Sequence, residues 1–372
     1  MRVLIYTSSG GTAHDAAAEA IADWLKLMAP EVTVTVESVL EKASSAYRSG
    51  VDLYNWIQRR APWLHQLYWR LMEFEDLIKP GTVLFGHGYL VRSLKRLQPD
   101  LLISTHPHTN RGHFDLAKRV VGPQLRCITC CTELDGGFGF SRNWVSPKAD
   151  LFWAITEEVA REVRRRRFPP ERIAVLGPLL HPPFHQKESS PPPRSEPAEA
   201  LPLLVLGTGA NGANNHLAQL EALLPFAGRL RVVALCGKRP EVRALVEAWG
   251  RAHPGLSLSA RGFQGPQAMV DLYREAWAMV ARPGARTATE ALTLGCPLIL
   301  NHHGLTMPQE LLAMRYFRAR HLEVSVRQPA QLAQVVGRWL DDPAVYENGR
   351  ERWAAFRLTA DPVAVISSLV AV

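Results

Sequence analysis

The chain has 372 residues, with 43 Lys and Arg against 35 Asp and Glu, a formal net charge of +8, and 47% hydrophobic residues. This length suggests two domains of ordinary size, and the apolar content excludes a disordered chain. The positive charge is compatible with nucleic acid, an anionic membrane surface or a phosphate-bearing substrate, and it does not choose among them.

The cysteines are odd in number and lack the spacing of a disulfide framework: Cys127, Cys130, Cys131, Cys236 and Cys296. This pattern favours a reducing compartment, and we expect core cysteines rather than a metal site. The N-terminus lacks the apolar region of a signal peptide, and no run of about 18 apolar residues occurs. We therefore expect a cytoplasmic protein with no transmembrane segment.

In the first half of the chain, apolar runs alternate with helical patterns. The runs predict strands over 2–7, 32–40, 99–107, 125–133, 149–156 and 172–177, with a helix over 14–28. This alternation is typical of βαβ units that build a parallel sheet.

The second half repeats this pattern after residues 186–201, which are rich in Pro, Ser and Glu and predict an exposed linker. An apolar run follows the linker directly, and further strands are predicted over 230–237, 256–263, 277–284 and 296–303. The sequence thus predicts an α/β protein with two Rossmann-like, doubly wound domains over 1–185 and 202–350. Ligands of such sheets bind beyond the carboxyl ends of the strands. Residues 351–372 are expected to form a C-terminal helix that packs back toward the first domain.

Residues 47–74 mix aromatic rings with cationic side chains, among them Trp56, Arg59, Arg60, Trp63 and Trp69. Such a stretch suits a membrane interface. A pair of core helices with a solvated, charged face is the alternative. The same two interpretations apply to the four consecutive arginines at 164–167: a solvated helix face or a patch for anionic lipid.

The first strand leads into a loop that contains Gly10, Gly11 and Thr12 and ends at His14. The functional interpretation is that this loop meets a substrate and that His14 transfers a proton. The alternative is a tight strand-to-helix turn with a histidine beside the helix. His106, at the end of the strand predicted over 99–107, is a second candidate, or a structural histidine.

A glycine-rich loop also follows the first strand of the second domain, and it contains Gly207, Gly209, Asn211 and Gly212. Free N–H groups in such a loop, together with a helix N-terminus, favour a phosphate group. The signal by itself is weak, because many loops of this kind are only tight turns.

Polar side chains gather after the strand predicted over 277–284 and after the next strand. Around the first turn they can hold a diphosphate, and a carboxylate one helical turn further can accept both hydroxyls of a ribose. An exposed acid near the helix N-terminus is the alternative for that carboxylate. After the next strand, two side chains can bind sugar hydroxyls. The first group is Arg282, Gly284, Arg286, Thr287 and Glu290, and the second is Gln309 and Glu310.

Together these stretches resemble the GT-B glycosyltransferases that include monogalactosyldiacylglycerol synthases and processive diacylglycerol glucosyltransferases, with lipid II N-acetylglucosaminyltransferase as a more distant relative. The similar stretches run in family order from residue 2 to about 310. They include GGTAHDAAAEAI, DLYNWIQRRAPWLHQLYW, PDLLISTHP, PPERIAVLGPLLHPPF, GFQGPQAMVDLYREAW and ARPGARTATEALTLGCPLILN.

The resemblance implies a GT-B fold, in which the two domains face a cleft, and it implies a role for each matching residue. His14 matches the acceptor-side base, and Glu133 stands where the family usually has an aspartate and is a second candidate base. On the donor side the resemblance implies ribose binding by Glu290, sugar contacts by Gln309 and Glu310, phosphate contacts by Gly207 to Gly212, and a backbone site for uracil at Gly262 and Phe263.

The expected reaction is an inverting transfer of a hexose from a UDP-sugar to a lipid, most simply diacylglycerol, in glycolipid synthesis. No D-x-D motif stands at a strand end, so we expect neither a catalytic metal nor another cofactor. The expected partners are the UDP-sugar, the lipid acceptor and an anionic membrane surface on the cytoplasmic side, and no nucleic acid. The alternatives are a polyprenyl-linked or soluble-sugar acceptor, an isomerase similar to UDP-N-acetylglucosamine 2-epimerases, and a degenerate module that binds nucleotide or membrane without turnover.

Overall fold

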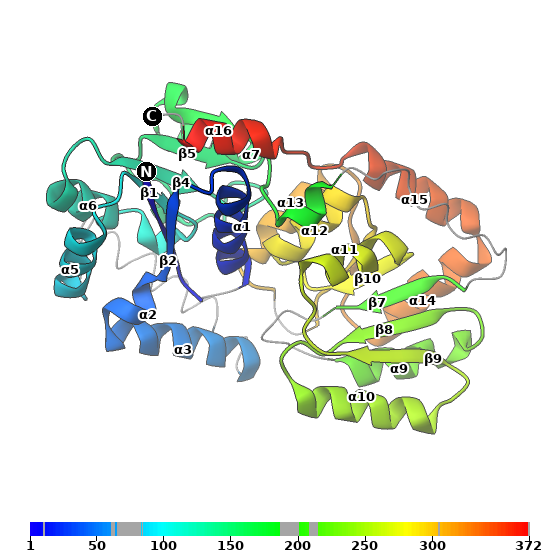
Figure 1. The fold of residues 1–372 in the computed structure, drawn as a ribbon. Coiled ribbons are helices and arrows are strands. Elements are labelled where there is room, and N and C mark those ends of the chain that lie inside the picture. The colour runs from blue at the N-terminus through cyan, green and yellow to red at the C-terminus, as the bar shows by residue number, and fades with distance from the viewer. Residues whose placement is uncertain are drawn as a thin grey trace. The chain divides into compact units, whose positions relative to one another are not determined.

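The computed structural model describes residues 1–9, 12–60, 64, 83, 85–186, 201–207, 215–303 and 306–370 (Figure 1). The chain divides into two compact units. Unit 1 contains Met1–Pro182, Met307–Ala313 and Thr359–Val372, and unit 2 contains Pro183–Thr306 and Met314–Leu358. Each unit is built on a six-stranded parallel sheet, so the repeated βα pattern predicted from the sequence is confirmed.

In unit 1 the sheet has the strand order β2-β1-β3-β4-β5-β6. The order reverses at β1, which lies between β2 and β3, and this makes the β1–β3 boundary the switch point of the sheet. The elements are β1 (Arg2–Thr7), α1 (Thr12–Met28), β2 (Thr33–Ser38), α2 (Val39–Ala43), α3 (Ser45–Arg60), α5 (His87–Leu97), β3 (Leu101–Ser104), η2 (Pro107–Thr109), α6 (His113–Val121), β4 (Arg126–Cys130), η3 (Arg142–Trp144), β5 (Leu151–Ala154), α7 (Glu157–Arg165), η4 (Pro170–Arg172), β6 (Ile173–Val175) and α16 (Pro362–Val370).

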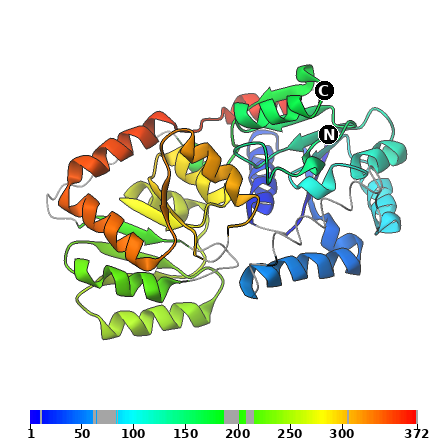
Figure 2. The ribbon, with the colours of Figure 1, turned by 180° about the vertical axis from the view of Figure 1, so that it is seen from behind.

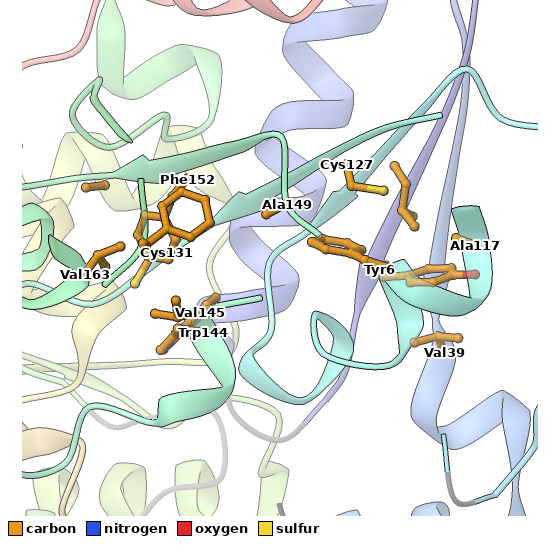
Figure 3. Packing of buried hydrophobic residues seen from close by; sticks show 14 of the residues in the cluster. Tyr6, Val39, Ala117, Cys127, Cys131, Trp144, Val145, Ala149, Phe152 and Val163 are labelled. Atoms are coloured by element: carbon orange, nitrogen blue, oxygen red, sulfur yellow. The ribbon is translucent and has the colours of Figure 1, made fainter. Parts of the chain in front are cut away.

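Both faces of this sheet are buried, which explains why its strands read as continuous apolar runs. On β1, Leu4 and Tyr6 belong to one core, whereas Val3 and Ile5 belong to the other. The first core lies under α5, α6 and α7, where α5 and α6 pack against each other (Figure 2). Figure 3 shows Tyr6 near Ala117 in this core.

The other face of the unit 1 sheet is covered by α1 and by α16, which contact each other (Figure 1). Val365, Ile366 and Leu369 of α16 share a core with Ile21 and Leu25 of α1. The single helix expected over 351–372 is wrong in detail: α15 (Pro343–Ala355) ends in unit 2, and α16 is a separate helix. The chain therefore returns to its first unit with its last helix.

In unit 2 the sheet has the order β12-β11-β10-β7-β8-β9, and its switch point lies between β7 and β10. Leu204 and Leu206 of β7 share a core with Leu220 of α9 and with Leu332 and Val336 of α14. The elements are α8 (Pro182–His185), β7 (Leu203–Leu206), α9 (His216–Leu223), η5 (Leu224–Phe226), β8 (Arg231–Leu235), α10 (Pro240–Ala252), β9 (Ser257–Arg261), α11 (Pro266–Glu275), β10 (Ala278–Ala281), α12 (Ala285–Leu294), β11 (Leu298–Asn301), β12 (Val324–Val326), α14 (Pro329–Asp341) and α15. Helix α13 (Glu310–Arg318) is shared: it belongs to unit 1 as far as Ala313 and to unit 2 from Met314.

The structure differs from the sequence prediction at several boundaries. The strand predicted over 32–40 ends at Ser38, because Val39 and Leu40 begin α2 and bury their side chains in the first core of unit 1. The three-residue strand β12 was not predicted, since it is too short to show a period. Residues 307–313 group with unit 1 rather than with the second domain, and Leu312 is buried in the unit 1 core.

Two smaller expectations concern cysteines and membrane spans. All five cysteines are free and buried, as expected for core residues. Within the described ranges, no helix is long and apolar enough to cross a membrane.

We expect Gly177→Ala to lower the stability of unit 1. Gly177 has a φ of +71°, and a Cβ there would collide with the main-chain oxygen of Thr359, where the chain returns to unit 1. Gly228→Ala is the matched control, because Gly228 has a φ of +75° and no atom within 4 Å of the added Cβ. The control measures the left-handed backbone cost alone, about 1–2 kcal/mol. Denaturant unfolding should show a clearly larger loss for Gly177→Ala, and equal losses would contradict this packing.

Candidate functional site

The switch point of unit 1 brings together two histidines that the sequence placed after different strands. His14 is in the first turn of α1, directly after β1, and His106 follows β3. Their ring centroids lie 4.6 Å apart, edge to face. Trp144 of η3 lies 5.7 Å from the His14 ring. Because β1 and β3 are neighbours in the sheet, their carboxyl ends deliver both imidazoles to one place.

His14 is held in position at its ring and at its main chain. Its Nδ1 lies 3.2 Å from the Thr132 hydroxyl, and its carbonyl oxygen accepts a hydrogen bond of 3.0 Å from the Thr105 hydroxyl. Burial lowers the pKa of His14 from 6.5 to about 4. The imidazole is therefore neutral at pH 7 and can accept a proton.

His106 and His113, which lie near His14, are also neutral at pH 7. Burial, together with neighbouring histidines, holds the pKa of His106 well below its usual value, and burial lowers the pKa of His113 to about 4. The main-chain N–H of His108 donates to Nδ1 of His106 at 3.2 Å, and Asn143 lies 3.1 Å from Nδ1 of His108. The hydrogen bond from His108 ties His106 to the turn that follows it, which agrees with the prediction of a structural histidine. The His106 ring also packs against the His14 ring.

Glu133 follows β4 and lies next to Thr132, the residue that contacts His14. Its side chain is buried, and burial raises its pKa from 4.5 to about 8. At pH 7 the carboxyl group is therefore mostly protonated. Of the two candidate bases, His14 has the protonation state of a base at neutral pH, whereas Glu133 has that of an acid.

The segment with Gln309 and Glu310 belongs to unit 1. Glu310 is 2% exposed, and its Oε2 accepts a hydrogen bond of 2.8 Å from the main-chain N–H of Met307, at the start of α13. Through this hydrogen bond Glu310 holds the segment that leads into α13. Gln309 donates from Nε2 to the hydroxyl of Tyr54 on α3 at 2.8 Å.

Helix α3 presents different residues to solvent and to the core. Trp56 and Leu53 are each 47% exposed, whereas Ile57 is 3% exposed. The exposed apolar side chains are what a membrane-binding helix would show, and the buried side is what a core helix would show, so α3 has features of both alternatives. Three further candidates lie in described helices, but their side chains are outside the described part of the structure: Arg59 and Arg60 at the end of α3, and Thr12 at the start of α1. The other four candidates, Gly10, Gly11, Trp63 and Trp69, lie outside the described residues.

The four consecutive arginines at 164–167 lie at the C-terminal end of α7 and have acidic partners within that helix. Arg165 and Arg166 both pair with Glu162, at 3.0 and 2.8 Å, and Arg164 lies 3.5 Å from Glu157. These ion pairs favour the solvated helix face over a lipid-binding patch.

In unit 2 the switch point lies between the ends of β7 and β10. The N–H of Gly207 donates to the carbonyl of Val280 at 2.7 Å, and a Cβ at Gly207 would lie only 3.2 Å from that oxygen. A side chain at this position would therefore be tightly packed against the end of β10. Gly209, Asn211 and Gly212 lie outside the described residues.

Glu290, in α12, is 4% exposed, so the alternative of an exposed surface acid is wrong. Its Oε2 accepts a hydrogen bond of 3.0 Å from the Tyr273 hydroxyl, and its Oε1 pairs with Nε of Arg286 at 2.8 Å. The carboxylate is thus fixed by two donors, and lone pairs remain on both oxygens for further donors. The sequence analysis missed Tyr273, because a tyrosine on the buried side of α11 resembles any core aromatic.

The remaining donor candidates lie at strand ends of unit 2. Arg282 follows β10 and donates to the carbonyl of His303 at 2.6 Å, and Gly284 precedes α12, whose first turn carries Thr287. Gly262 and Phe263 follow β9. The carbonyl of Gly262 accepts from the Gln264 side chain at 3.1 Å, and Phe263 is exposed, with Lys238 Nζ 5.0 Å from its ring centroid.

Comparisons with known proteins match the part of the chain that holds the histidine site. The family model described as monogalactosyldiacylglycerol (MGDG) synthase matches residues 14–179. This stretch starts at His14 and contains Glu133. Over these residues the chain is similar to the MGDG synthase family.

Relatives of this MGDG-synthase-like chain extend the similarity over both units. It is 23% identical over 350 residues to the processive diacylglycerol β-glucosyltransferase of Bacillus subtilis, covering 92% of this chain and 87% of the relative. It is 22% identical over 369 residues to the chloroplastic monogalactosyldiacylglycerol synthase of Spinacia oleracea, covering 92% and 67%. The crystal structure of MurG from Acinetobacter baumannii shares the fold with a TM-score of 0.59 at 16% identity over 99% and 98% of the two chains. The resemblance is confirmed: the chain is similar to diacylglycerol glycosyltransferases, and its fold is that of GT-B enzymes.

We expect the neutral histidines of unit 1 to make the protein sensitive to acid. A histidine whose folded pKa is lowered to about 4 contributes stability above its unfolded pKa of 6.5, and this stability is lost as the pH falls toward 4. Each such histidine lowers the free energy of unfolding by about 1.4 kcal/mol per pH unit in that window. Glu133 has the opposite effect, because its raised pKa means that the folded protein binds one proton more than the unfolded chain does.

Denaturant unfolding at pH 7, 6, 5 and 4.5 measures this effect. The free energy of unfolding should fall steadily below about pH 6, because among the described residues five histidines with lowered pKa values outweigh two carboxyl groups with raised pKa values. The histidines are His14, His106, His113, His185 and His216, and the carboxyl groups are those of Asp15 and Glu133. The variant His113→Gln should show a slope that is smaller by about one proton. An unchanged slope would mean that His113 is charged in the folded protein.

Proposed function

We propose that this glycosyltransferase moves a hexosyl group from a UDP-sugar to the free hydroxyl of a diacylglycerol-type lipid, with inversion at the anomeric carbon. The observation that carries the proposal is the neutral His14 at the switch point of unit 1. The names of the Bacillus subtilis and spinach relatives support a diacylglycerol acceptor.

His14 is proposed as the general base. Its unprotonated ring nitrogen takes the proton of the acceptor hydroxyl while the hydroxyl oxygen forms a bond to the anomeric carbon. The bond from that carbon to the β-phosphate oxygen breaks on the opposite face, and UDP leaves with the electron pair. The Thr132 hydroxyl at Nδ1 orients the ring, and a base in this role contributes about 10²–10⁴-fold to the rate.

Unit 2 is proposed to bind the nucleotide part of the donor. Its Glu290 carboxylate, held by Tyr273 and Arg286, accepts hydrogen bonds from the ribose hydroxyls. The guanidinium of Arg282 and the N-terminus of α12 stabilise the negative charge that develops on the leaving diphosphate. On this proposal the leaving group needs no metal ion, and activity should survive treatment with EDTA.

The exposed side of α3 is proposed to touch the membrane that holds the acceptor. An indole and an aliphatic side chain at Trp56 and Leu53 are exposed three residues apart on this helix. Their insertion into the interface would bring unit 1 to the lipid, and the net charge of +8 would favour anionic lipids.

A product assay tests the function. The protein is incubated with UDP-glucose, UDP-galactose or UDP-N-acetylglucosamine and with diacylglycerol in anionic vesicles, and the lipid extract is analysed by mass spectrometry. A diacylglycerol heavier by one hexose, formed with or without EDTA, is the expected result. Turnover of the donor without any lipid product would instead support an isomerase or a soluble acceptor, and UDP binding without turnover would support a binding module.

The pH dependence of transfer separates the two candidate bases. We expect His14→Asn to lower kcat by about 10²–10⁴-fold, since the base is removed. Glu133→Gln should keep most activity at pH 7, because the carboxyl group is protonated there and its pKa is about 8. The acid limb of kcat/KM should lie near pH 4, where His14 takes up its proton. An acid limb near pH 8 that disappears in Glu133→Gln would assign the base to Glu133 instead.

A further inference from the structure

The hydrogen bond from the main chain of His108 determines where His106 carries its ring proton. A main-chain N–H can only donate, and this one donates to Nδ1 of His106 at 3.2 Å. Nδ1 is therefore an acceptor and bears no hydrogen. Because burial and neighbouring histidines hold the pKa of His106 well below its usual value, the ring is neutral at pH 7 and its one proton lies on Nε2. His106 thus presents a donor at Nε2, and this donor has no hydrogen-bond partner among the described residues.

Four buried polar side chains fix the turn that carries His106. The hydroxyls of Ser104 and Thr109 each lie 3.0 Å from the carbonyl oxygen of His106, and Nδ2 of Asn110 donates to the same oxygen at 2.9 Å. The amide oxygen of Asn110 in turn accepts from the hydroxyl of Thr129 on β4 at 2.9 Å. All four of these residues are 0% exposed. A satisfied buried network of this kind holds one geometry, so the imidazole of His106 extends from a fixed main chain.

The ring that carries this donor lies beside the histidine proposed as the base. The ring centroids of His106 and His14 are 4.6 Å apart, with an angle of 79° between the ring planes. The two residues follow the neighbouring strands β3 and β1 of one sheet. A molecule whose hydroxyl reaches a ring nitrogen of His14 therefore places its next atoms close to the ring of His106.

A ring nitrogen that can only donate is matched by an oxygen that can only accept, and a carbonyl oxygen is such an atom. In a diacylglycerol whose free hydroxyl lies at one end of the glycerol, the neighbouring carbon atom bears an ester. An ester carbonyl oxygen therefore lies close to the hydroxyl that reacts. A donor that loses water on substrate binding and finds no partner is costly, so a lipid that has this oxygen is favoured over one that lacks it.

We propose that His106 determines the class of acceptor: its Nε2–H donates a hydrogen bond to an ester carbonyl oxygen of the diacylglycerol whose free hydroxyl reaches His14. This inference rests on the proposed function, in which the acceptor is a diacylglycerol-type lipid and His14 is the base. His106 binds the substrate beside the reacting hydroxyl and takes up no proton itself. The protein then distinguishes esters of glycerol from ethers, which a site that recognised only the acyl chains would treat alike.

Two lipids that differ in their carbonyl oxygens test the proposal. The full chain is given a diacylglycerol or a dialkylglycerol of the same chain length, each in vesicles of phosphatidylglycerol and phosphatidylcholine, together with the UDP-sugar that supports transfer. Both lipids have the free hydroxyl, but only the diacylglycerol has ester carbonyl groups. The kcat/KM of the wild-type protein should be higher for the diacylglycerol by about three- to tenfold, the size of one hydrogen bond.

The variant His106→Asn removes the Nε2–H donor and keeps the contact that closes the turn. The N–H of His108 only donates, so the amide oxygen of the new side chain faces it in place of Nδ1, an arrangement that asparagine forms readily. The shorter side chain ends before the position of Nε2. The preference for the diacylglycerol should disappear in this variant. His113→Asn is the matched control, because His113 is also buried but packs edge-on against Tyr6, and it should leave the preference unchanged.

The outcomes separate this inference from the proposed function. If the wild-type protein uses both lipids with equal kcat/KM, or if His106→Asn lowers both values alike, the role of His106 is overturned and transfer to the lipid stands. If the wild-type protein transfers a hexose to neither lipid, both are overturned.

Nitrogen NMR of the protein with isotope-labelled histidines tests the tautomer without turnover. The ring signals that are absent from His106→Asn belong to His106. At pH 7 they should show an unprotonated Nδ1 and a protonated Nε2. A proton on Nδ1 would overturn the inference, because Nε2 would then be an acceptor.

Discussion

Parallel pairing with one reversal of strand order is the constraint on which both units depend. All strands of a sheet deliver their carboxyl ends to one edge, and at the reversal the following segments leave toward opposite faces. In unit 1 this geometry brings His14 and His106 into ring contact although they are far apart in the chain. In unit 2 it brings the glycine after β7 against the end of β10. The chemistry of the protein is therefore assembled by its topology.

Burial has two opposite consequences at the histidine site. It lowers the pKa of His14 and raises that of Glu133, so that at neutral pH the imidazole is a base and the carboxyl group is an acid. The same desolvation makes the fold sensitive to acid, since each buried imidazole resists a proton that the unfolded chain would bind. The burial that keeps the His14 imidazole neutral at pH 7 therefore also lowers the free energy of unfolding in acid.

The hydrogen-bond partners that hold the candidate site residues in place could not be predicted from the sequence. The turn after β10 indicated Glu290 as a ligand of ribose, because a carboxylate one turn into a helix is a local pattern. Nothing in that pattern indicated Tyr273, which reaches Glu290 from α11. Tyr54 is a stronger example, since it lies 255 positions from Gln309. The sequence likewise did not indicate that Glu310 accepts a hydrogen bond from the main-chain N–H of Met307 just before α13.

The sequence by itself determined what depends on neighbours in the chain: the alternation of strand and helix, the glycine-rich turns, the buried cysteines and the position of His14 after the first strand. These features follow from period, turn chemistry and apolar runs, which are local. Only the tertiary structure decided that residues 307–313 and α16 join unit 1, that Glu133 is protonated at pH 7, and that Tyr54 holds Gln309. These depend on burial and on contacts between distant segments, and neither is encoded in any short stretch of sequence.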